Sequence, residues 1–94
     1  RRVGRFYYPL SMDGSPDGRI YVLDAGSGRI VAFDARGQYI TQWGRPGSGP
    51  GEFGFGKGAL LTVGRDFAGS LAVGADGSIY VADPGNRRIQ RFAP

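Results

Sequence analysis

The chain lacks the side chains on which most enzymes and metal centres depend. Its 94 residues include no histidine and no cysteine, which removes the commonest general base, the commonest metal ligand and every thiolate nucleophile. The eight carboxylates are dispersed along the chain. We therefore predict that the protein is not an enzyme and has no catalytic residue, no metal site and no cofactor.

Residues 13–24, DGSPDGRIYVLD, come closest to a metal site. Asp13, Asp17 and Asp24 fall at positions 1, 5 and 12 of a calcium-binding EF-hand loop. Pro16 is unusual inside such a loop, position 12 is normally glutamate, and no helix is expected on either side. Hairpin turn chemistry accounts for the same residues, so we do not assign calcium binding here.

Residues 51–58, GEFGFGKG, have spacing similar to a phosphate-binding loop, and an overlapping stretch fits G-x-G-x-x-G. Both motifs need a strand that leads into a helix, and this region offers neither. Gly58 also replaces the hydroxyl residue that would bind magnesium. We interpret the stretch as an exposed loop whose Phe53, Phe55 and Lys57 could contact a partner.

The chain contains one sequence unit twice. Residues 17–33 and 76–92 match without a gap at a constant offset of 59 positions, as from Tyr21 to Tyr80. Internal repeats of this kind are typical of repeat architectures. Two copies of the unit account for most of the chain.

Each copy has the pattern of β-strands separated by tight turns. Residues 20–23 and 79–82 are continuous apolar runs, which are typical of strands covered on both faces. Asp-Gly pairs that end at Gly18 and Gly77 precede these runs and favour turns with positive φ. The sequence therefore predicts an all-β fold built from small antiparallel meanders.

Charged residues at equivalent positions are expected to have structural roles. Asp24 and Asp83 precede the second turn of each copy, where a carboxylate can accept backbone hydrogen bonds. Arg29 and Arg88 are also equivalent to each other. We expect these arginines to pair with an aspartate or to cover an aromatic ring.

Two further arginines, Arg87 and Arg91, occur only in the second copy, where Gly28 and Ala32 stand in the first. A residue that does not recur in the repeat is a better candidate for a specific contact than one that does. We therefore predict that Arg87 and Arg91 contact a partner.

Together these segments resemble the NHL repeat. The second copy carries IYVAD at 79–83 and GNRRI at 85–89, and the first carries IYVLD at 20–24. The first copy continues to Trp43 and then into GSGPGEF at 47–53, which is similar to the usual inter-repeat stretch of that family. The resemblance covers nearly the whole chain and implies blades of a β-propeller, each of four antiparallel strands and most often six to a ring.

The resemblance also divides the chain into segments. Residues 1–5 are expected to be the tail of an outer strand of a preceding blade, and 6–44 a complete NHL-like blade. Residues 45–66 are expected to form a Gly-rich inter-blade loop with an insertion at 55–66, and 67–94 a second blade without its outer strand. The tripeptide that names the family is Asn-Arg-Arg at 86–88 in the second copy but Ser-Gly-Arg in the first.

Two blades alone would leave apolar faces and strand edges exposed, and about three repeats are needed for a stable stack. We therefore expect either a segment of a larger propeller or a chain that assembles into a ring. The sequence begins with Arg1 rather than methionine, which is in line with a processed protein or part of a longer one.

Three functions are compatible with this arrangement. The first is a non-catalytic scaffold that binds other protein chains. The second is binding of single-stranded RNA, since the net charge is +4, although Tyr21, Tyr80, Phe33 and Phe92 fall at core-like positions. The third is membership of a propeller lyase or lactonase whose catalytic residues lie in other blades.

No apolar run is long enough to cross a membrane, no signal peptide is visible, and family habits favour an extracytoplasmic bacterial setting.

Overall fold

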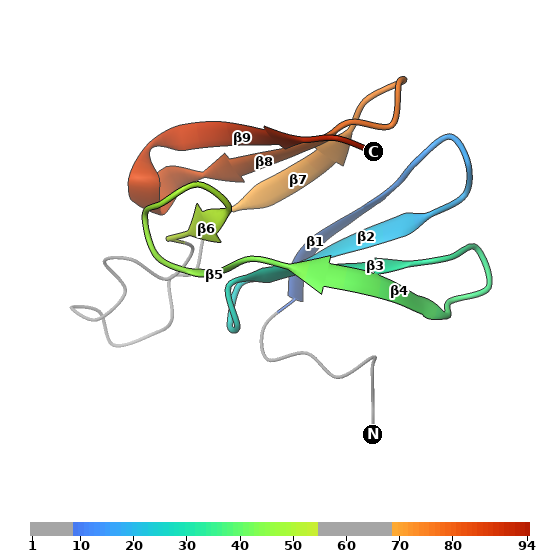
Figure 1. Cartoon of the computed structure of the whole chain (residues 1–94), viewed down its shortest axis with the longest axis horizontal. Helices are drawn as coiled ribbons and strands as arrows, with labels where there is room; N and C mark the ends of the chain where they lie inside the picture. Colours follow the sequence, from blue (N-terminus) through green and yellow to red (C-terminus); the bar gives the residue numbers. More distant parts are fainter. Residues whose placement is uncertain (1–8, 55–68) are drawn as a thin grey trace.

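The computed structural model of the chain describes residues 9–54 and 69–94, which form two antiparallel sheets and a short parallel strand pair (Figure 1). The first sheet has the strand order β1-β2-β3-β4, the second has β7-β8-β9, and β5 pairs with β6. The strands are β1 Pro9–Gly14, β2 Ile20–Asp24, β3 Arg29–Phe33, β4 Tyr39–Trp43, β5 Arg45–Pro46, β6 Glu52–Phe53, β7 Ser70–Val73, β8 Ile79–Asp83 and β9 Arg88–Phe92. A 3₁₀ turn, η2 Pro84–Asn86, precedes β9.

Both sheets are antiparallel meanders, as the repeat predicts. In the first sheet Ile20 pairs with Phe33 and Asp24 with Arg29, and in the second Ile79 pairs with Phe92 and Asp83 with Arg88. The paired residues of the two hairpins are related by the same offset of 59 positions. The sequence repeat therefore corresponds to a repeat in strand register, and the prediction of an all-β fold is confirmed.

The Asp-Gly turns have the backbone conformation that their residues favour. Gly18 and Gly77 have φ values of 92° and 86°, a region that residues with a Cβ rarely adopt. Gly18 donates its N–H to the carbonyl of Ser15, and Gly77 donates to that of Gly74. These bonds close the turns before β2 and β8.

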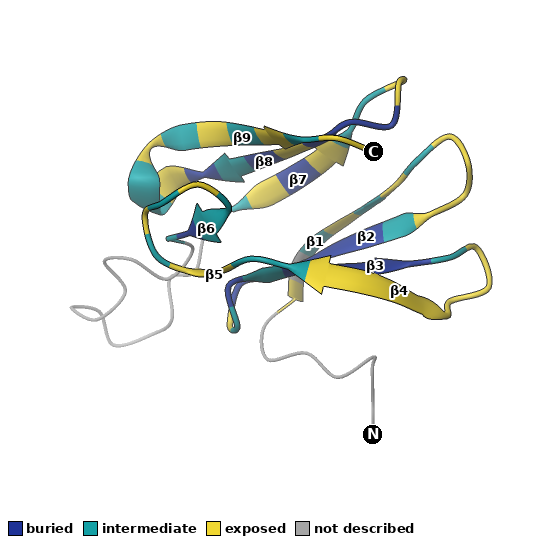
Figure 2. Ribbon diagram, in the orientation of Figure 1, coloured by how far each residue is buried: buried dark blue, intermediate teal, exposed yellow. Residues whose placement is uncertain are grey.

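The two sheets pack against each other through one apolar face each (Figure 2). The first sheet contributes Tyr21, Leu23 and Ile30, and the second contributes Ile79 and Val81, all of which are buried. Because apolar area removed from water stabilises by about 25 cal/mol per Å², this shared core is the main contact between the sheets.

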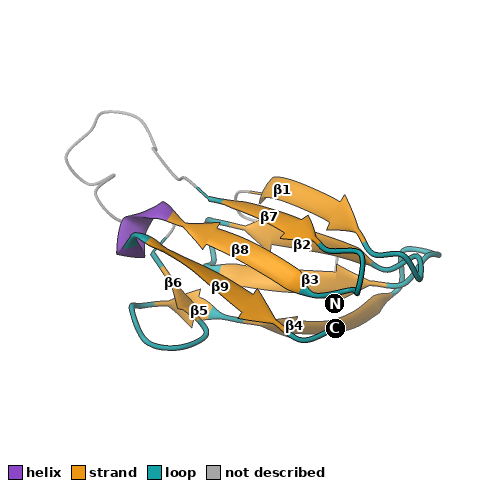
Figure 3. Cartoon of the chain, turned by 90° about the horizontal axis from the view of Figure 1, so that it is seen from above, coloured by secondary structure: helices purple, strands orange, loops and turns teal. Residues whose placement is uncertain are grey.

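Strands β1 and β7 lie side by side (Figure 3). Polar side chains of β1 also join the two strands. Asp13 Oδ2 accepts the backbone N–H of Val73 at 2.8 Å, and Ser11 Oγ accepts that of Leu71 at 3.3 Å. Both donors lie on the edge of β7 that does not pair with β8. Side chains of the first sheet thus satisfy backbone groups at the edge of the second.

The outer face of the second sheet, which points away from the first, differs from the expectation. The apolar run at 79–82 predicts cover on both faces, yet Tyr80 is 39% exposed, while Val81 on the inner face is fully buried. The placement of Tyr80 among core residues is therefore wrong for this structure. The reason is that, within the described ranges, no element packs on this outer face.

The inter-sheet segment at 45–54 is exposed only in part: Arg45, Pro46, Ser48 and Pro50 are exposed, but the end of the segment packs into the core. The ring of Phe53 is only 1% exposed, and its centroid lies 6.0 Å from that of Phe92. Gly44 has φ 99°, and a Cβ there would lie 2.6 Å from Cε2 of Phe53. Glycine thus lets the chain leave β4 close to the Phe53 ring.

We predict that Asp13→Ala weakens the joint between β1 and β7. The change leaves the N–H of Val73 without its acceptor, which should lower the free energy of unfolding by about 1–2 kcal/mol. Urea unfolding followed by far-ultraviolet circular dichroism measures this loss. The control is Arg36→Ala at the exposed β3–β4 turn, and an equal stability for Asp13→Ala and this control would contradict the prediction.

Candidate functional site

The second turn of each repeat is organised around a fully buried aspartate. Asp24 Oδ2 accepts the hydroxyl of Ser27 at 2.9 Å and lies 3.6 Å from Nε of Arg29. Arg29 also donates to the hydroxyl of Ser27 and to the side chain of Gln42 on β4. Asp24 and Arg29 are thus cross-strand partners on β2 and β3, and their side chains form an ion pair.

The equivalent aspartate, Asp83, joins the second sheet to the inter-sheet segment. It accepts the backbone N–H of Gly54 at 2.9 Å and the amide N–H of Asn86 at 2.9 Å, and it lies 3.8 Å from Nε of Arg88. Ser27 and Asn86 are therefore counterparts, because each donates to the aspartate of its own repeat. Sequence reasoning missed this role of Asn86, although the offset of 59 positions aligns it with Ser27.

The side chains that follow Asp83 bind the backbone of the inter-sheet segment. Asn86 donates to the carbonyl of Gly47 at 2.8 Å, and Nη2 of Arg88 donates to the carbonyls of Gly49 and Glu52 at 2.7 Å each. Gln90 Nε2 also donates to the carbonyl of Glu52 at 2.9 Å. Arg88 is thus a structural residue of this joint.

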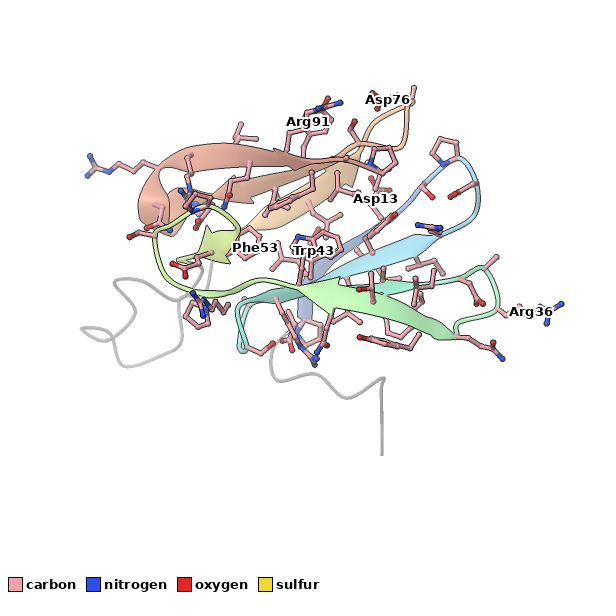
Figure 4. The ribbon with its side chains drawn as sticks, in the orientation of Figure 1. Asp13, Arg36, Trp43, Phe53, Asp76 and Arg91 are labelled. Atoms are coloured by element: carbon pink, nitrogen blue, oxygen red, sulfur yellow. The ribbon has the colours of Figure 1, made fainter. Side chains whose placement is uncertain are left out.

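The two arginines predicted to contact a partner have different surroundings. Arg87 is exposed and adopts a left-handed backbone conformation with φ 55°, which ends the η2 turn. Arg91 is also exposed, but its Nη2 donates to Ser78 Oγ at 2.8 Å and lies 3.6 Å from Asp76 (Figure 4). Arg87 is therefore the more available cation of the pair.

Phe53 is the one partner-contact residue that the structure contradicts. Its ring lies within the shared core rather than on the surface, because the chain after Gly44 returns to cover the aromatic residues Trp43 and Phe92 (Figure 4). The other two residues of that prediction, Phe55 and Lys57, lie outside the described residues.

Residues 47–54, the described part of the glycine-rich segment, use four of their glycine N–H groups in internal hydrogen bonds. The N–H groups of Gly47, Gly49, Gly51 and Gly54 already have acceptors within the protein. These acceptors are, in the same order, the carbonyl oxygen of Phe53, Oε1 of Glu52, Oε1 of Gln90 and Oδ1 of Asp83. A phosphate loop needs free donors that converge on one point. The donors of this segment instead form hydrogen bonds within the segment and to the second sheet.

The spacing that resembles a calcium loop does not bring its carboxylates together. Asp24 is paired with Pro9 at one end of the β1–β2 hairpin, whereas Gly14, next to Asp13, is paired with Ile20 at the other. Asp13 instead accepts the N–H groups of Gly14 and Val73. The Asp13 carboxylate thus accepts backbone N–H groups, whereas the Asp24 carboxylate faces the side chains of Ser27 and Arg29.

The outer face of the second sheet carries exposed apolar side chains. Ile89 on β9 is 72% exposed, and Tyr80 and Ala72 on the neighbouring strands are exposed too. The cross-strand pairs in this sheet place Arg91 beside Tyr80. This combination of methyl, aromatic and basic side chains can dock another surface.

Turn carboxylates are ionised more readily than usual. The side-chain hydrogen bond from Ser15 is the largest cause of the lowered pKa of Asp17, and the N–H of Ser78 has that role for Asp76. The N–H of Gly49, followed by Arg45, lowers the pKa of Glu52. Such groups stabilise the folded state above their unfolded pKa, and this stabilisation is lost as the pH falls through the folded pKa.

We therefore predict that stability falls on acidification from about pH 5 to about pH 3, and that Glu52→Gln removes part of this dependence. The reason is that glutamine keeps the hydrogen-bonding shape but has no proton to gain. The measurement is the urea midpoint at a series of pH values, with Arg36→Gln as the control. An unchanged pH dependence in Glu52→Gln would show that the bonds of Glu52 to Gly49 and Arg45 do not form in solution.

Comparisons with known proteins agree with this architecture. Residues 15–57 match a protein-family model described as a 6-bladed beta-propeller, and this range contains β2 to β6. No match is found among the curated proteins. None of the helical structure in the described ranges is long and apolar enough to cross a membrane. The family match and the two packed antiparallel meanders together indicate a fragment of a β-propeller fold.

Proposed function

We propose that the chain is a non-catalytic, NHL-type propeller segment that acts as a scaffold by packing against further protein blades, in the same molecule or in an assembly. The NHL resemblance rests on the IYVAD and GNRRI segments of the second copy and their counterparts in the first. The proposal of a packing role rests on the outer face of the second sheet, as follows.

The two sheets present the same face in different states of burial. Tyr21 and Ile30 of the first sheet are 3% and 0% exposed because the second sheet covers them. Their equivalents in the second sheet, Tyr80 and Ile89, are 39% and 72% exposed. The same face is thus buried in the first repeat and exposed in the second. This difference is the observation that supports a further blade packed on the second sheet.

Exposed apolar area of this kind favours association with a matching sheet. The matching surface is the kind that the second sheet presents to the first, a row of aliphatic side chains such as Leu71, Ile79 and Val81. The carboxylates of the described residues favour the scaffold over an enzyme, since Asp13, Asp24 and Asp83 are each engaged in structural hydrogen bonds.

We expect the 94-residue chain to form an assembly larger than the monomer in sedimentation velocity, and Ile89→Lys to dissociate it, because a lysine cannot be buried there without a partner. The control is Gln38→Lys, which adds the same charge at an exposed position of the β3–β4 turn.

If the chain is monomeric in sedimentation velocity, its dye binding and its melting behaviour distinguish two cases. A monomer that binds a hydrophobic dye and melts without cooperativity would support completion by blades of a larger protein. A monomer that melts in one sharp transition and binds no dye would contradict the scaffold proposal.

A second candidate, binding of single-stranded RNA, is favoured by one observation. Tyr80 and Arg91 are cross-strand neighbours on the open face, and an exposed aromatic ring beside a guanidinium suits base stacking and phosphate contact. Exposure of Tyr80 removes the earlier objection that its ring belongs to the core.

For this candidate we expect a fluorescein-labelled oligouridylate to show a rise in anisotropy at low salt, reduced several-fold by Tyr80→Ala, since stacking contributes about 1–3 kcal/mol per base. Tyr39→Ala is the matched control, because Tyr39 on β4 has a similar exposure of 37%. A flat anisotropy at low salt would discard RNA binding.

A further inference from the structure

The described part of the chain contains the pair Asp-Gly three times, at 13–14, 17–18 and 76–77. In such a pair the backbone nitrogen of the glycine can attack the side-chain carboxyl carbon of the aspartate, because glycine has no Cβ that hinders the approach. Ring closure gives a succinimide, and hydrolysis of the succinimide gives isoaspartate. The surroundings of the nitrogen and of the carboxyl group therefore decide which pair reacts.

In two of the three pairs the glycine nitrogen is directed away from the aspartate side chain. Gly18 donates its N–H to the carbonyl of Ser15 at 3.0 Å, and Gly77 donates to that of Gly74 at 2.9 Å. These bonds close the two turns, so an attack by either nitrogen first requires the turn to open.

The carboxylates of the same two pairs are also held by other donors. Asp17 accepts the hydroxyl of Ser15, and Asp76 accepts the backbone N–H of Ser78 at 3.0 Å. These bonds are the largest causes of the lowered pKa of each carboxyl group. A group that stays ionised releases water less readily, which slows ring closure at both positions.

The pair at 13–14 has the opposite arrangement. Gly14 donates its N–H to Oδ1 of Asp13 at 2.9 Å. Gly14 is exposed at the end of β1, so water can reach the pair. The attacking nitrogen is thus held beside the carboxyl group, and a rotation about the Cα–C bond of Asp13 brings it from the oxygen to Cγ.

The second sheet adds a donor on the other oxygen of this carboxyl group. Val73 on β7 donates its N–H to Oδ2 of Asp13 at 2.8 Å (Figure 4). When the nitrogen of Gly14 attacks Cγ, negative charge collects on the carboxyl oxygen, and a fixed N–H donor stabilises this charge. An unfolded chain lacks the donor, because Asp13 and Val73 are 60 positions apart.

We propose that Asp13 is a site of spontaneous isomerisation to isoaspartate, and that the packing of the two sheets promotes the reaction. The bond between Gly14 N and Asp13 Cγ forms, the nitrogen loses its proton, and a Cγ–O bond breaks with release of water. Water then adds to the former main-chain carbonyl carbon of Asp13, where the C–N bond breaks. One water is released and one is consumed, so no oxidant, cofactor or further reactant takes part. The reaction does not depend on the proposed scaffold function.

Isomerisation removes the contact that promotes it. Isoaspartate adds a methylene group to the main chain and carries its free carboxylate directly on Cα. The carboxylate then no longer reaches the N–H of Val73 with the same geometry. The joint between β1 and β7 therefore has a finite chemical lifetime.

The test compares two Asp-Gly pairs within one tryptic peptide. Trypsin cleaves after Arg5 and Arg19 and releases residues 6–19, which contain both Asp13 and Asp17. The 94-residue chain is kept at neutral pH and physiological temperature for several weeks before digestion. Electron-transfer dissociation of the peptide then locates and quantifies isoaspartate. A synthetic peptide of residues 6–19, aged in the same way, gives the ratio in the absence of the fold.

We expect the ratio of isoaspartate at Asp13 to isoaspartate at Asp17 to be about ten-fold higher in the chain than in the synthetic peptide, since one fixed donor to a developing oxyanion contributes about 10²–10³ in favourable sites. In the synthetic peptide neither pair has such a donor.

A variant, Gly14→Ala, tests the attacking nitrogen. A Cβ at this position lies 3.5 Å from the carbonyl oxygen of Arg19, an ordinary van der Waals contact, so the fold is kept. The methyl group hinders ring closure, and isoaspartate at Asp13 should fall several-fold while that at Asp17 stays unchanged. The control Arg36→Ala, at the exposed β3–β4 turn, should leave both values unchanged. Circular dichroism confirms that both variants fold.

A ratio in the chain that is equal to or lower than that in the synthetic peptide overturns the proposal. The same holds if Gly14→Ala forms as much isoaspartate at Asp13 as the unchanged chain does. These results are read from peptide fragments after ageing, whereas the scaffold proposal is read from the sedimentation of fresh protein. Either proposal can therefore fail without the other.

Discussion

The contact between the inner faces of the two sheets is the interaction on which the rest of the molecule depends. Each sheet is thin, with a core face that is unstable in water unless another layer covers it. The second sheet covers Tyr21 and Ile30 of the first, and in doing so it buries its own Ile79 and Val81. The aromatic residues Trp43, Phe53 and Phe92 pack around this same contact.

The inter-sheet segment connects the two sheets, and hydrogen bonds hold it against the second sheet. Asp83, Asn86 and Arg88 hold its backbone at several points, and Phe53 inserts a ring beside Phe92. A glycine-rich stretch is flexible as a free chain, and here its flexibility is what lets donors and acceptors meet. The buried charge of Asp83 is acceptable because its carboxylate accepts hydrogen bonds from Gly54 and Asn86 and faces the half-buried guanidinium of Arg88.

Much of the fold followed from local sequence information. The gap-free repeat, the Asp-Gly turns and the apolar runs depend on neighbouring residues, so they predicted the strands and the turns between them. The burial of Phe53 could not be predicted in this way, because it depends on where the segment after β4 folds back in space. The exposure of Tyr80 was missed for the opposite reason, since its sequence context is the same as that of buried Tyr21 and only the absence of a covering layer among the described residues differs.

The pair Asp13 and Ala72 shows that the repeats are not interchangeable as neighbours. Asp13 reaches across to satisfy the N–H of Val73 on the adjoining inner strand, and the residue at the corresponding place in the second repeat is Ala72. Any layer that stacks on the second sheet meets a methyl group where the first sheet offers a carboxylate. In a stack of such units, one interface between sheets therefore contains this side-chain hydrogen bond and the next does not. Mechanical or thermal opening would start at the interface that lacks the hydrogen bond.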